Sequence, residues 1–555
     1  MSNHVAFEKI QSYIDIAQKY NAKLTVVGDT LFIVSDKKDL PEIADFIFNK
    51  NKCTFRVCVG TDERPINGYF SLTHIFTDDK AGLYIALNTY LESENPVAPS
   101  IAPVVPAADW CEMEARDLLG IEFTGRENYR LVLPPDWPEN YYPLRKDFPY
   151  SYRPPVKAMS ERASEHQEAG VVPVGPYHPA LHEPEYFELL VEGEHVVDVK
   201  YRGFHVHRGI EKLAESRLTY QQVNFLAERI CGICGFEHST CYALAVEKAA
   251  ELDVPERAQY IRSIVLEVER LHSHLLWLGV AFHLVGYDAG FMHVWRIREK
   301  VMYLAELLTG SRKTYGINLI GGVRRDINED KKQKVLETLR ELRKEFTNFI
   351  EVALAVPQVK RRLTGTGVLS KEDAVKLSVE GPVARASGID RDARRDLPYA
   401  GYKNVSFKVP VYTEGDNLAR ALVRVDEIFE SIHMIEQLLD SIPSGPIMLE
   451  NFEIPEGRIG IQVVEAPRGG DIHFVLTGKG KPYRWRVRAP TYSNIPALRV
   501  MLRDQPLADA PLTIASIDPC FSCTDRAVVI RSYTTGKVLS VTTLERIASK
   551  VRKSE

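Results

Sequence analysis

Two short stretches of this chain, Glu228-Arg-Ile-Cys-Gly-Ile-Cys-Gly-Phe-Glu-His238 and Asp518-Pro-Cys-Phe-Ser-Cys-Thr-Asp-Arg526, decide how it has to fold. Each contains a Cys-x-x-Cys pair, and the four thiolates of two such pairs can bind one metal ion. Because the pairs lie far apart in the chain, a shared site requires the residues between them to fold back on themselves. The pairs alone leave three other interpretations open: a structural zinc site, a dithiol redox motif, or cysteines buried in a helical core.

Length and composition indicate a globular protein with more than one domain. The chain has 555 residues, of which 45% are hydrophobic and 26% charged, and this is an ordinary globular mixture. A net charge of -5 gives no electrostatic footprint for nucleic acid. The N-terminus lacks the pattern of a secretory signal, and the most apolar stretch, Leu275 to Tyr287, is too short to span a bilayer. We therefore expect a cytoplasmic protein whose membrane contact, if any, is made through a partner.

Hydrophobic periodicity divides the chain into two folded units. Residues 1–150 combine helical patterns with short β-branched and aromatic runs, which predicts a small α+β domain. Residues 151–170 lack apolar periodicity and are interpreted as a linker. Residues 171–526 carry long helical stripes and two extended segments, which predicts a mainly α-helical domain with small β elements. The stripes cover 261–275, 335–350 and 418–439, and the extended segments cover 458–474 and 483–487.

The surroundings of the cysteines are more specific than their spacing. The two stretches resemble the signature motifs of the large subunit of nickel-iron hydrogenases, R-x-C-G-x-C-x-x-x-H and D-P-C-x-x-C-x-x-[HR], and both matches are complete. Residues 114–121 and 142–149 resemble the 30-kilodalton-type subunit of respiratory complex I, and residues 175–179 and 207–212 resemble its 49-kilodalton-type neighbour. A fusion of these units that keeps four cysteines is similar to the catalytic large subunit of the complex-I-related, membrane-bound hydrogenases of the formate hydrogenlyase type, the group of hydrogenase-3 and hydrogenase-4.

The resemblance implies a nickel-iron centre. In it, Cys231 and Cys520 would be terminal ligands of nickel, while Cys234 and Cys523 would bridge nickel to an iron that carries carbon monoxide and cyanide. Soft thiolates suit such a redox-active centre. The remaining cysteines show no arrangement suited to an iron-sulfur cluster, so electrons must leave through a partner subunit. These cysteines are Cys53, Cys58, Cys111 and Cys241, and we interpret them as ordinary apolar side chains.

A proton released at a buried metal needs a carboxylate as its first acceptor. Glu183, in Leu181-His-Glu-Pro184, matches the gating glutamate of the family. Glu185 and Glu192 lie nearby and are the alternatives to it. Acidic residues are usually just solvated at the surface, and this is the ordinary interpretation of both. We expect Glu183 to be the acceptor.

The resemblance also implies residues that surround the metals. Arg468, in Ala466-Pro-Arg-Gly469, is similar to an arginine that is suspended over the metals and donates to a cyanide. Pro467 belongs to the same segment, and Thr491 matches a segment that supplies a second donor. Asp518 would join Arg468 around the open side of the centre.

One triplet departs from the family pattern. Many uptake-type relatives carry His-Asp-His where this sequence has His272-Ser273-His274, so the charge near Arg468 differs. Glu237 lies inside the first motif, but nothing in the motif requires an acid there, and we leave it out of the site.

The resemblance implies a large assembly that reduces protons to H2 reversibly. Its expected partners are the iron-sulfur small subunit, further iron-sulfur electron-transfer subunits, integral membrane complex-I-like subunits and formate dehydrogenase. A maturation endopeptidase and nickel-insertion proteins would act on the chain, and residues 527–555 would be a C-terminal extension that is removed on maturation. The protein would lie peripherally on the inner face of the cell membrane. Two alternatives stay open: a hydrogenase coupled to carbon monoxide or ferredoxin, and a complex-I-like scaffold with structural zinc.

Overall fold

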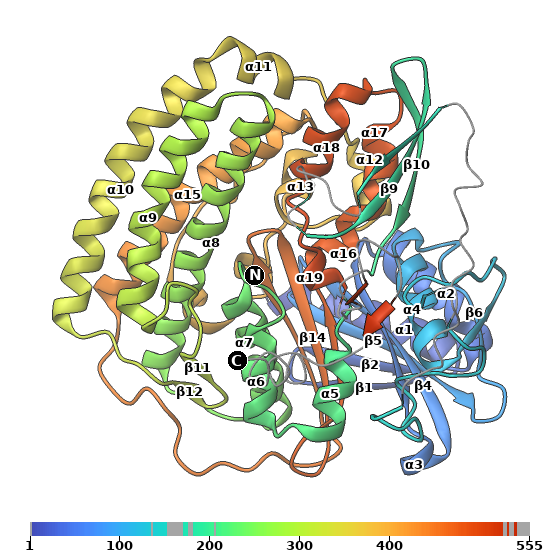
Figure 1. Ribbon diagram of the computed structural model, residues 1–555. Helices are drawn as coiled ribbons and strands as arrows, with labels where there is room; N and C mark the ends of the chain where they lie inside the picture. Colours follow the sequence, from blue (N-terminus) through green and yellow to red (C-terminus); the bar gives the residue numbers. More distant parts are fainter. Residues whose placement is uncertain are drawn as a thin grey trace.

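A computed structural model describes residues 3–134, 137–152, 170–175, 181, 183–204, 207–525, 530–531 and 538–540. Within these residues the chain forms an α+β unit at its N-terminus and a larger unit built around long helices (Figure 1). Most of the expected linker, residues 153–169, lies outside the described residues, as does most of the expected C-terminal extension.

The N-terminal unit is built on a five-stranded mixed sheet of order β1-β2-β5-β4-β3, in which only β2 and β5 run parallel. Its strands are β1 (Lys23–Val27), β2 (Thr30–Val34), β3 (Thr54–Asp62), β4 (Tyr69–Asp78) and β5 (Leu83–Glu92). A short parallel pair joins β6 (Val97–Pro99) to β7 (Glu122–Thr124). The helices are α1 (Asn3–Lys19), α2 (Leu40–Asp45), α3 (Arg64–Asn67) and α4 (Asp109–Leu119). The short β-branched and aromatic runs form these five strands, and α2 continues as a π-helical turn, Phe46–Lys50.

Four long helices lie side by side and form the body of the second unit (Figure 1). They are α8 (Glu256–Leu284), α9 (Asp288–Thr309), α10 (Glu329–Ala355) and α15 (Asn417–Ser441). Their apolar stripes are buried as the periodicity predicts. Shorter helices precede and follow them: α5 (Ile210–Arg217), α6 (Tyr220–Glu228), α7 (Gly235–Ala249), α11 (Pro357–Leu363), α12 (Lys371–Lys376), α13 (Gly381–Ala386), α14 (Ala393–Asp396), α16 (Pro490–Asn494), α17 (Leu498–Leu502), α18 (Ala510–Ser516) and α19 (Phe521–Thr524).

Two antiparallel three-stranded sheets complete this unit. The expected extended segments form β13 (Ile459–Ala466), β14 (Gly469–Thr477) and β15 (Pro482–Arg488). The periodicity did not predict the sheet of β8 (Val171–Val174), β9 (Tyr186–Glu192) and β10 (His195–Arg202). Two-stranded ladders join β11 (Asn318–Leu319) to β12 (Gly322–Val323), and β16 (Ile530–Arg531) to β17 (Val538–Ser540). No helix in the described part of the chain has both the length and the apolar character needed to cross a membrane.

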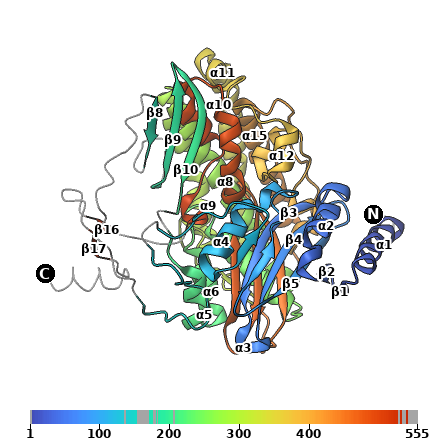
Figure 2. The same cartoon turned by 90° about the vertical axis from the view of Figure 1, so that its right-hand side faces the viewer.

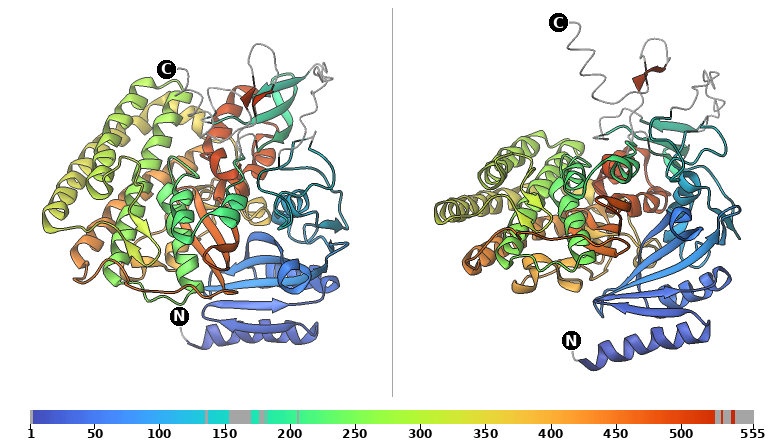
Figure 3. Two further views of the ribbon diagram at one scale, coloured as in Figure 1. Left: turned by 60° about the horizontal axis from the view of Figure 1, so that its bottom comes forward. Right: turned by 90° about the horizontal axis from the view of Figure 1, so that it is seen from below.

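A row of arginines on β15 joins the two units. Arg484, Arg486 and Arg488 alternate along the strand, so they lie on one face. Arg486 binds Glu114 of α4 at 2.6 and 2.7 Å, while Arg484 and Arg488 donate to backbone carbonyls of β3. Figures 2 and 3 show the N-terminal sheet, in blue, beside the β13–β15 sheet. The edge strand β3 is therefore buried along its whole length.

Candidate metal centre

The first cysteine pair lies in the tight loop between α6 and α7. Gly235 opens α7, and a side chain there would collide with the carbonyl oxygen of Glu228. Cys234 gives no side-chain cap to the helix, so Glu269 of α8 accepts the free N–H groups of Phe236 and Glu237, each at 3.0 Å. This external cap fixes the N-terminus of α7 beside the cysteines.

Backbone groups of the same loop point at the first thiol. Ile233 N and Cys234 N donate to Cys231 Sγ at 3.1 and 3.4 Å. Hydrogen bonds with the neighbouring Cys234, Cys520 and Cys523 thiols hold the pKa of Cys231 well below its usual range. Cys231 is therefore prepared to be a thiolate, which is the form that binds a metal.

The second cysteine pair lies at the start of α19. Asp518 precedes it with a left-handed backbone (φ +54°), a conformation that aspartate tolerates better than most residues. Cys520 N donates to Thr491 Oγ1 at 3.2 Å. Because Thr491 accepts this bond, its own hydroxyl hydrogen is available to a bound group, as the resemblance implied.

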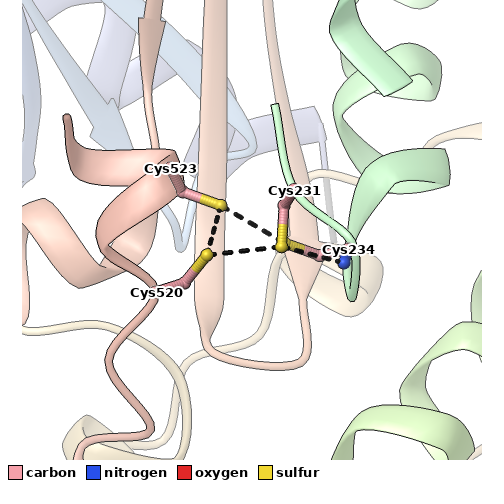
Figure 4. Close-up of side chains that lie close together, drawn as sticks. All are labelled: Cys231, Cys234, Cys520 and Cys523. Carbon is pink, nitrogen blue, oxygen red and sulfur yellow. Dashed lines mark hydrogen bonds between the residues drawn. The ribbon is translucent and has the colours of Figure 1, made fainter. Parts of the chain in front are cut away.

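All four sulfur atoms meet in one buried cluster (Figure 4). Cys520 Sγ lies 2.8 Å from Cys523 Sγ and 3.3 Å from Cys231 Sγ, and Cys523 Sγ lies 3.6 Å from Cys234 Sγ. The four side chains are only 3% to 4% exposed. Four sulfurs bonded tetrahedrally to one metal at about 2.3 Å would lie about 3.8 Å apart. The cluster therefore has the size of a metal site, and its donor set suits nickel and iron as well as zinc.

Arg468 reaches this cluster from the tip of the β13–β14 hairpin. The hairpin turns over two residues, Pro467 and Arg468, because Ala466 pairs directly with Gly469. A Cβ at Gly469 would lie 2.5 Å from the Glu380 side chain, so glycine lets the tip pack closely. Pro467 thus has a structural part in the site, since it fixes one φ angle of the turn that presents the guanidinium.

Arg468 and Asp518 form a buried ion pair. Arg468 donates to the carbonyl oxygen of Asp518 at 2.6 Å and to its carboxylate at 2.9 Å. Burial by itself would lower the pKa of Arg468, but Asp518 and the thiolates of Cys520, Cys234 and Cys231 outweigh it and raise that pKa well above its usual value. The arginine is therefore a fixed positive charge beside the sulfurs.

Two atoms of this ion pair bear on whether the site fits a nickel-iron group as well as zinc. Arg468 Nη1 and Asp518 Oδ2 are buried and have no hydrogen-bond partner among the described residues. A buried donor without an acceptor costs about 1 to 3 kcal/mol. A centre with small acceptor ligands such as cyanide would satisfy Nη1, so the residues fit the nickel-iron group.

Glu183 lies against the second cysteine loop. Its carboxylate accepts Ser522 N at 2.6 Å and also accepts the Ser522 hydroxyl. Arg208 donates to the carbonyl oxygen of Ser522 at 3.0 Å, and to the carbonyl oxygens of Arg229 and Ile230 at 2.7 and 2.5 Å. Arg208 therefore ties the loop before Cys231 to the loop between Cys520 and Cys523. Sequence reasoning missed Ser522 and Arg208, although both lie inside segments that carried the resemblance.

The two competitors of Glu183 occupy different surroundings. Glu192 is exposed at the end of β9. Glu185 is buried, and burial together with the neighbouring Asp525 carboxyl raises its pKa well above the usual range. Of the three, Glu183 is the one whose carboxylate accepts hydrogen bonds from the cysteine loop in the part of the chain that the structure describes. This geometry supports the choice of Glu183, whose role stays a prediction.

Two further sequence features lie deep in the helical core. Ser273 is buried in α8, and its hydroxyl has no hydrogen-bond partner in the part of the chain that is described. Its neighbours His272 and His274 bind Arg298 and Glu427, each at 2.7 Å.

Glu237 is fully buried, and burial and the nearby Glu269 raise its pKa well above the usual range. It differs from an ordinary solvated acid, but no contact to the sulfurs assigns it a role.

A histidine of the first motif touches the cluster as well. His238 Nε2 lies 3.3 Å from Cys523 Sγ, and His238 Nδ1 lies 2.8 Å from the carboxylate of Asp471. Burial lowers the pKa of His238, but Asp471 outweighs this effect and raises it above its ordinary value. Sequence reasoning missed Asp471. The signal in the sequence that could have found Asp471 is its spacing from His473. The two residues are two positions apart on one strand, which places both side chains on one face of the sheet.

The other cysteines form no second metal group. Cys53, Cys58, Cys111 and Cys241 are buried and form no disulfide, and none belongs to a cluster of metal-ligating side chains among the described residues. Arg526, which ends the second motif, lies outside the described residues.

Comparison with known proteins identifies the same two units. Residues 33–154 match the family "Respiratory-chain NADH dehydrogenase, 30 Kd subunit", and residues 285–456 and 447–526 match its "49 Kd subunit" counterpart. Residues 208–297 match the family "Nickel-dependent hydrogenase". These matches confirm the resemblance that the motifs carried.

Relatives match over nearly the full length. The chain is 45% identical to formate hydrogenlyase subunit 5 of Escherichia coli (strain K12), with 90% of each chain covered. It is 44% identical to hydrogenase-4 component G of the same organism, over 88% of this chain and 87% of that one. A solved structure of the membrane-bound sulfane sulfur reductase, an archaeal respiratory membrane complex, contains a chain that matches with a TM-score of 0.61 and 35% identity, covering 64% of this chain and 98% of that one.

These matches and the fold define the protein class: it is a nickel-dependent hydrogenase, an oxidoreductase whose family has nickel and iron at the active site, joined to complex-I-like units. Within this class, the chain belongs to the family of formate hydrogenlyase subunit 5 and hydrogenase-4 component G.

We expect Arg208→Gln to loosen both cysteine loops, because it removes three hydrogen bonds that each contribute about 1 kcal/mol. In the metal-free full chain, Cys231 and Cys520 should react with iodoacetamide up to about 100-fold faster, since about 3 kcal/mol in total corresponds to two factors of ten at about 1.4 kcal/mol each. Mass spectrometry of alkylated peptides measures the rates. Arg217→Gln, at an exposed arginine that ends α5, is the control. Equal rates in the two variants would contradict the role of Arg208.

Proposed function

We propose that this chain is the catalytic large subunit of a membrane-bound nickel-iron hydrogenase that reduces protons to H2 reversibly. Cys231 and Cys520 would hold nickel, and Cys234 and Cys523 would bridge it to iron with carbon monoxide and cyanide ligands. The observation that supports this best is the combination of four converging buried thiols with the unsatisfied guanidinium of Arg468 beside them.

The bound centre would supply the exchange of electrons and the making or breaking of H2. The protein would contribute a dry site, since the sulfurs, Arg468 and Asp518 are all at least nine-tenths buried. Arg468 Nη1 and the hydroxyl of Thr491 would donate to cyanide ligands. Asp518 holds the guanidinium in place through two hydrogen bonds.

Glu183 would hold the proton that enters or leaves the site. Its half-buried carboxylate lies between the sulfur cluster and the outside, and Ser522 fixes it through two hydrogen bonds. A carboxyl that is held in place against the second cysteine loop would be positioned to act as a general acid–base. Electrons would leave through an iron-sulfur partner, because the other cysteines in the described residues form no metal-ligating group.

The wider assembly follows from the same proposal. Both E. coli relatives match across the N-terminal unit as well as the hydrogenase unit, which favours formate over carbon monoxide or ferredoxin as the electron source. The partners would be the iron-sulfur small subunit, further iron-sulfur subunits, membrane-embedded complex-I-like subunits and formate dehydrogenase. They would hold the chain on the cytoplasmic face of the membrane. Identification of the electron donor that purifies with the complex distinguishes these sources.

The metal content tests the centre directly. The purified complex should contain nickel and iron in equal amounts in this chain, and infrared spectra should show bands of bound carbon monoxide and cyanide. Cys520→Ser replaces a soft ligand with a poor one and should remove the bands and reduce H2 evolution to background. Cys241→Ser, at a buried cysteine outside the cluster, is the control. Zinc without infrared bands would instead support the scaffold alternative.

Proton transfer is tested at Glu183. Glu183→Gln keeps the size of the side chain but removes the titrating group, so H2 evolution and hydrogen–deuterium exchange should fall by about 100-fold or more. Nickel content and infrared bands should stay unchanged. Glu192→Gln, an exposed residue of the same hairpin, should keep normal rates. Normal turnover in Glu183→Gln would transfer the role to Glu185 or to water.

We propose that residues 527–555 are removed after nickel insertion, with the cut immediately after Arg526. Only residues 530–531 and 538–540 of this segment are described. The support is the complete match of the second motif, which ends at Arg526 and lies just beyond a ligand pair. The intact mass of the chain in active enzyme should correspond to a terminus at Arg526. A fully active chain that still ends at Glu555 would refute processing.

A further inference from the structure

A chain of buried polar side chains leads away from the sulfur cluster into the β13–β15 sheet. His238 Nε2 faces Cys523 Sγ at 3.3 Å, and His238 Nδ1 lies 2.8 Å from Asp471 Oδ2. His473 Nε2 lies 3.2 Å from the same oxygen, and Trp485 Nε1 donates to His473 Nδ1 at 3.2 Å. Each of these four side chains, His238, Asp471, His473 and Trp485, is at most 1% exposed. Their contacts are therefore shielded from the solvent.

Trp485 sets the direction of these hydrogen bonds. An indole N–H can only donate, so His473 Nδ1 accepts and carries no hydrogen. A neutral His473 then has its hydrogen on Nε2, which faces Asp471. The carboxylate can only accept, and a bare nitrogen at 2.8 Å would place two lone pairs against each other. His238 Nδ1 therefore also carries a hydrogen, and this leaves Nε2 of His238 toward Cys523. His238 Nδ1 also lies 3.4 Å from His473 Nε2, and the Asp471 oxygens make no well-aligned hydrogen bond among the described residues, so the carboxylate acts on both rings through its charge.

A metal ion between these side chains is the competing interpretation. His238, Asp471 and His473 each offer a ligand atom, and the three atoms lie within 4.8 Å of one another. A metal would need the lone pair of His473 Nε2, but Trp485 already occupies the lone pair on Nδ1. Histidines that bind metals normally donate their other N–H to an acceptor, and Trp485 cannot accept. The contacts therefore favour a hydrogen-bonded cluster.

We propose that Asp471 is a positioning residue of the metal centre, which holds the ring of His238 with Nε2 against Cys523 Sγ. The inference rests on the proposed function only for the role of Cys523 as a bridging ligand. The ring orientation decides which edge of His238 meets this sulfur, so it would tune the electron density on the sulfur and on both metals. Asp471 acts from β14 and touches no proposed ligand with its carboxylate.

Nitrogen-15 solid-state NMR on the full chain with labelled histidine tests the arrangement without requiring a loaded centre. Difference spectra with His238→Gln and His473→Gln assign the two rings. We expect a hydrogen on Nε2 of His473 and on Nδ1 of His238. Asp471→Asn should split the His238 signals into more than one set, and Trp485→Phe should release the fixed tautomer of His473. A hydrogen on His473 Nδ1 in the wild type, or unchanged His238 signals in Asp471→Asn, would overturn the proposal.

Infrared spectra of the loaded enzyme give a second readout. Asp471→Asn should shift or broaden the carbon monoxide and cyanide bands at unchanged nickel content. Cys241→Ser is the matched control, because Cys241 contacts Asp471 only through its backbone oxygen, at 3.4 Å, and its bands should not shift. A third metal ion per chain that is lost in Asp471→Asn would refute the positioning role and establish a metal site. A wild type without nickel and diatomic bands would refute the proposed function, while the NMR result would still decide the role of Asp471.

Discussion

The cost of burying charge controls the architecture around the cysteines. Four thiols and the guanidinium of Arg468 lie together away from water, and an isolated buried charge costs several kcal/mol. Asp518 compensates part of this cost through its carboxylate, and the thiolates compensate another part. The Nη1 donor of Arg468 has no acceptor among the described residues. This favours a bound ligand that carries a hydrogen-bond acceptor. A group that presents small acceptors toward Arg468 would complete the site.

Buried ion pairs of arginine with carboxylates are also found where the two units meet. Arg486 lies in a buried pair with Glu114, and Arg56 of β3 lies in a buried pair with Glu380. Breaking one such pair costs about 3 to 5 kcal/mol because it leaves an uncompensated charge. The N-terminal unit is therefore held to the sheet whose hairpin tip presents Arg468. Docking of this unit and the position of Arg468 depend on the same strands.

The second cysteine loop contains two of the proposed metal ligands and contacts the proposed proton acceptor, Glu183. Ser522 lies between the two cysteines, and all of its polar groups are engaged: its N–H and hydroxyl by Glu183, and its carbonyl by Arg208. A movement of this loop would move the proposed proton acceptor together with two proposed ligands. His238 contacts the same loop at Cys523 from the opposite motif. The two motifs thus support each other through side chains other than the cysteines.

The sequence by itself determined the chemistry and the elements. The cysteine motifs predicted the ligands and identified the family, because few chains combine these residues at this spacing, and the periodicity predicted the long helices α8, α10 and α15 and the strands β13–β15. Only the tertiary structure decided which polar groups meet. Ser522, Arg208 and Asp471 follow no motif rule, since each acts through a residue far away in the chain. The cap of α7 by Glu269 and the tautomer set by Trp485 have the same origin. Such contacts depend on how helices and strands pack in three dimensions, and local sequence patterns carry no information about that packing.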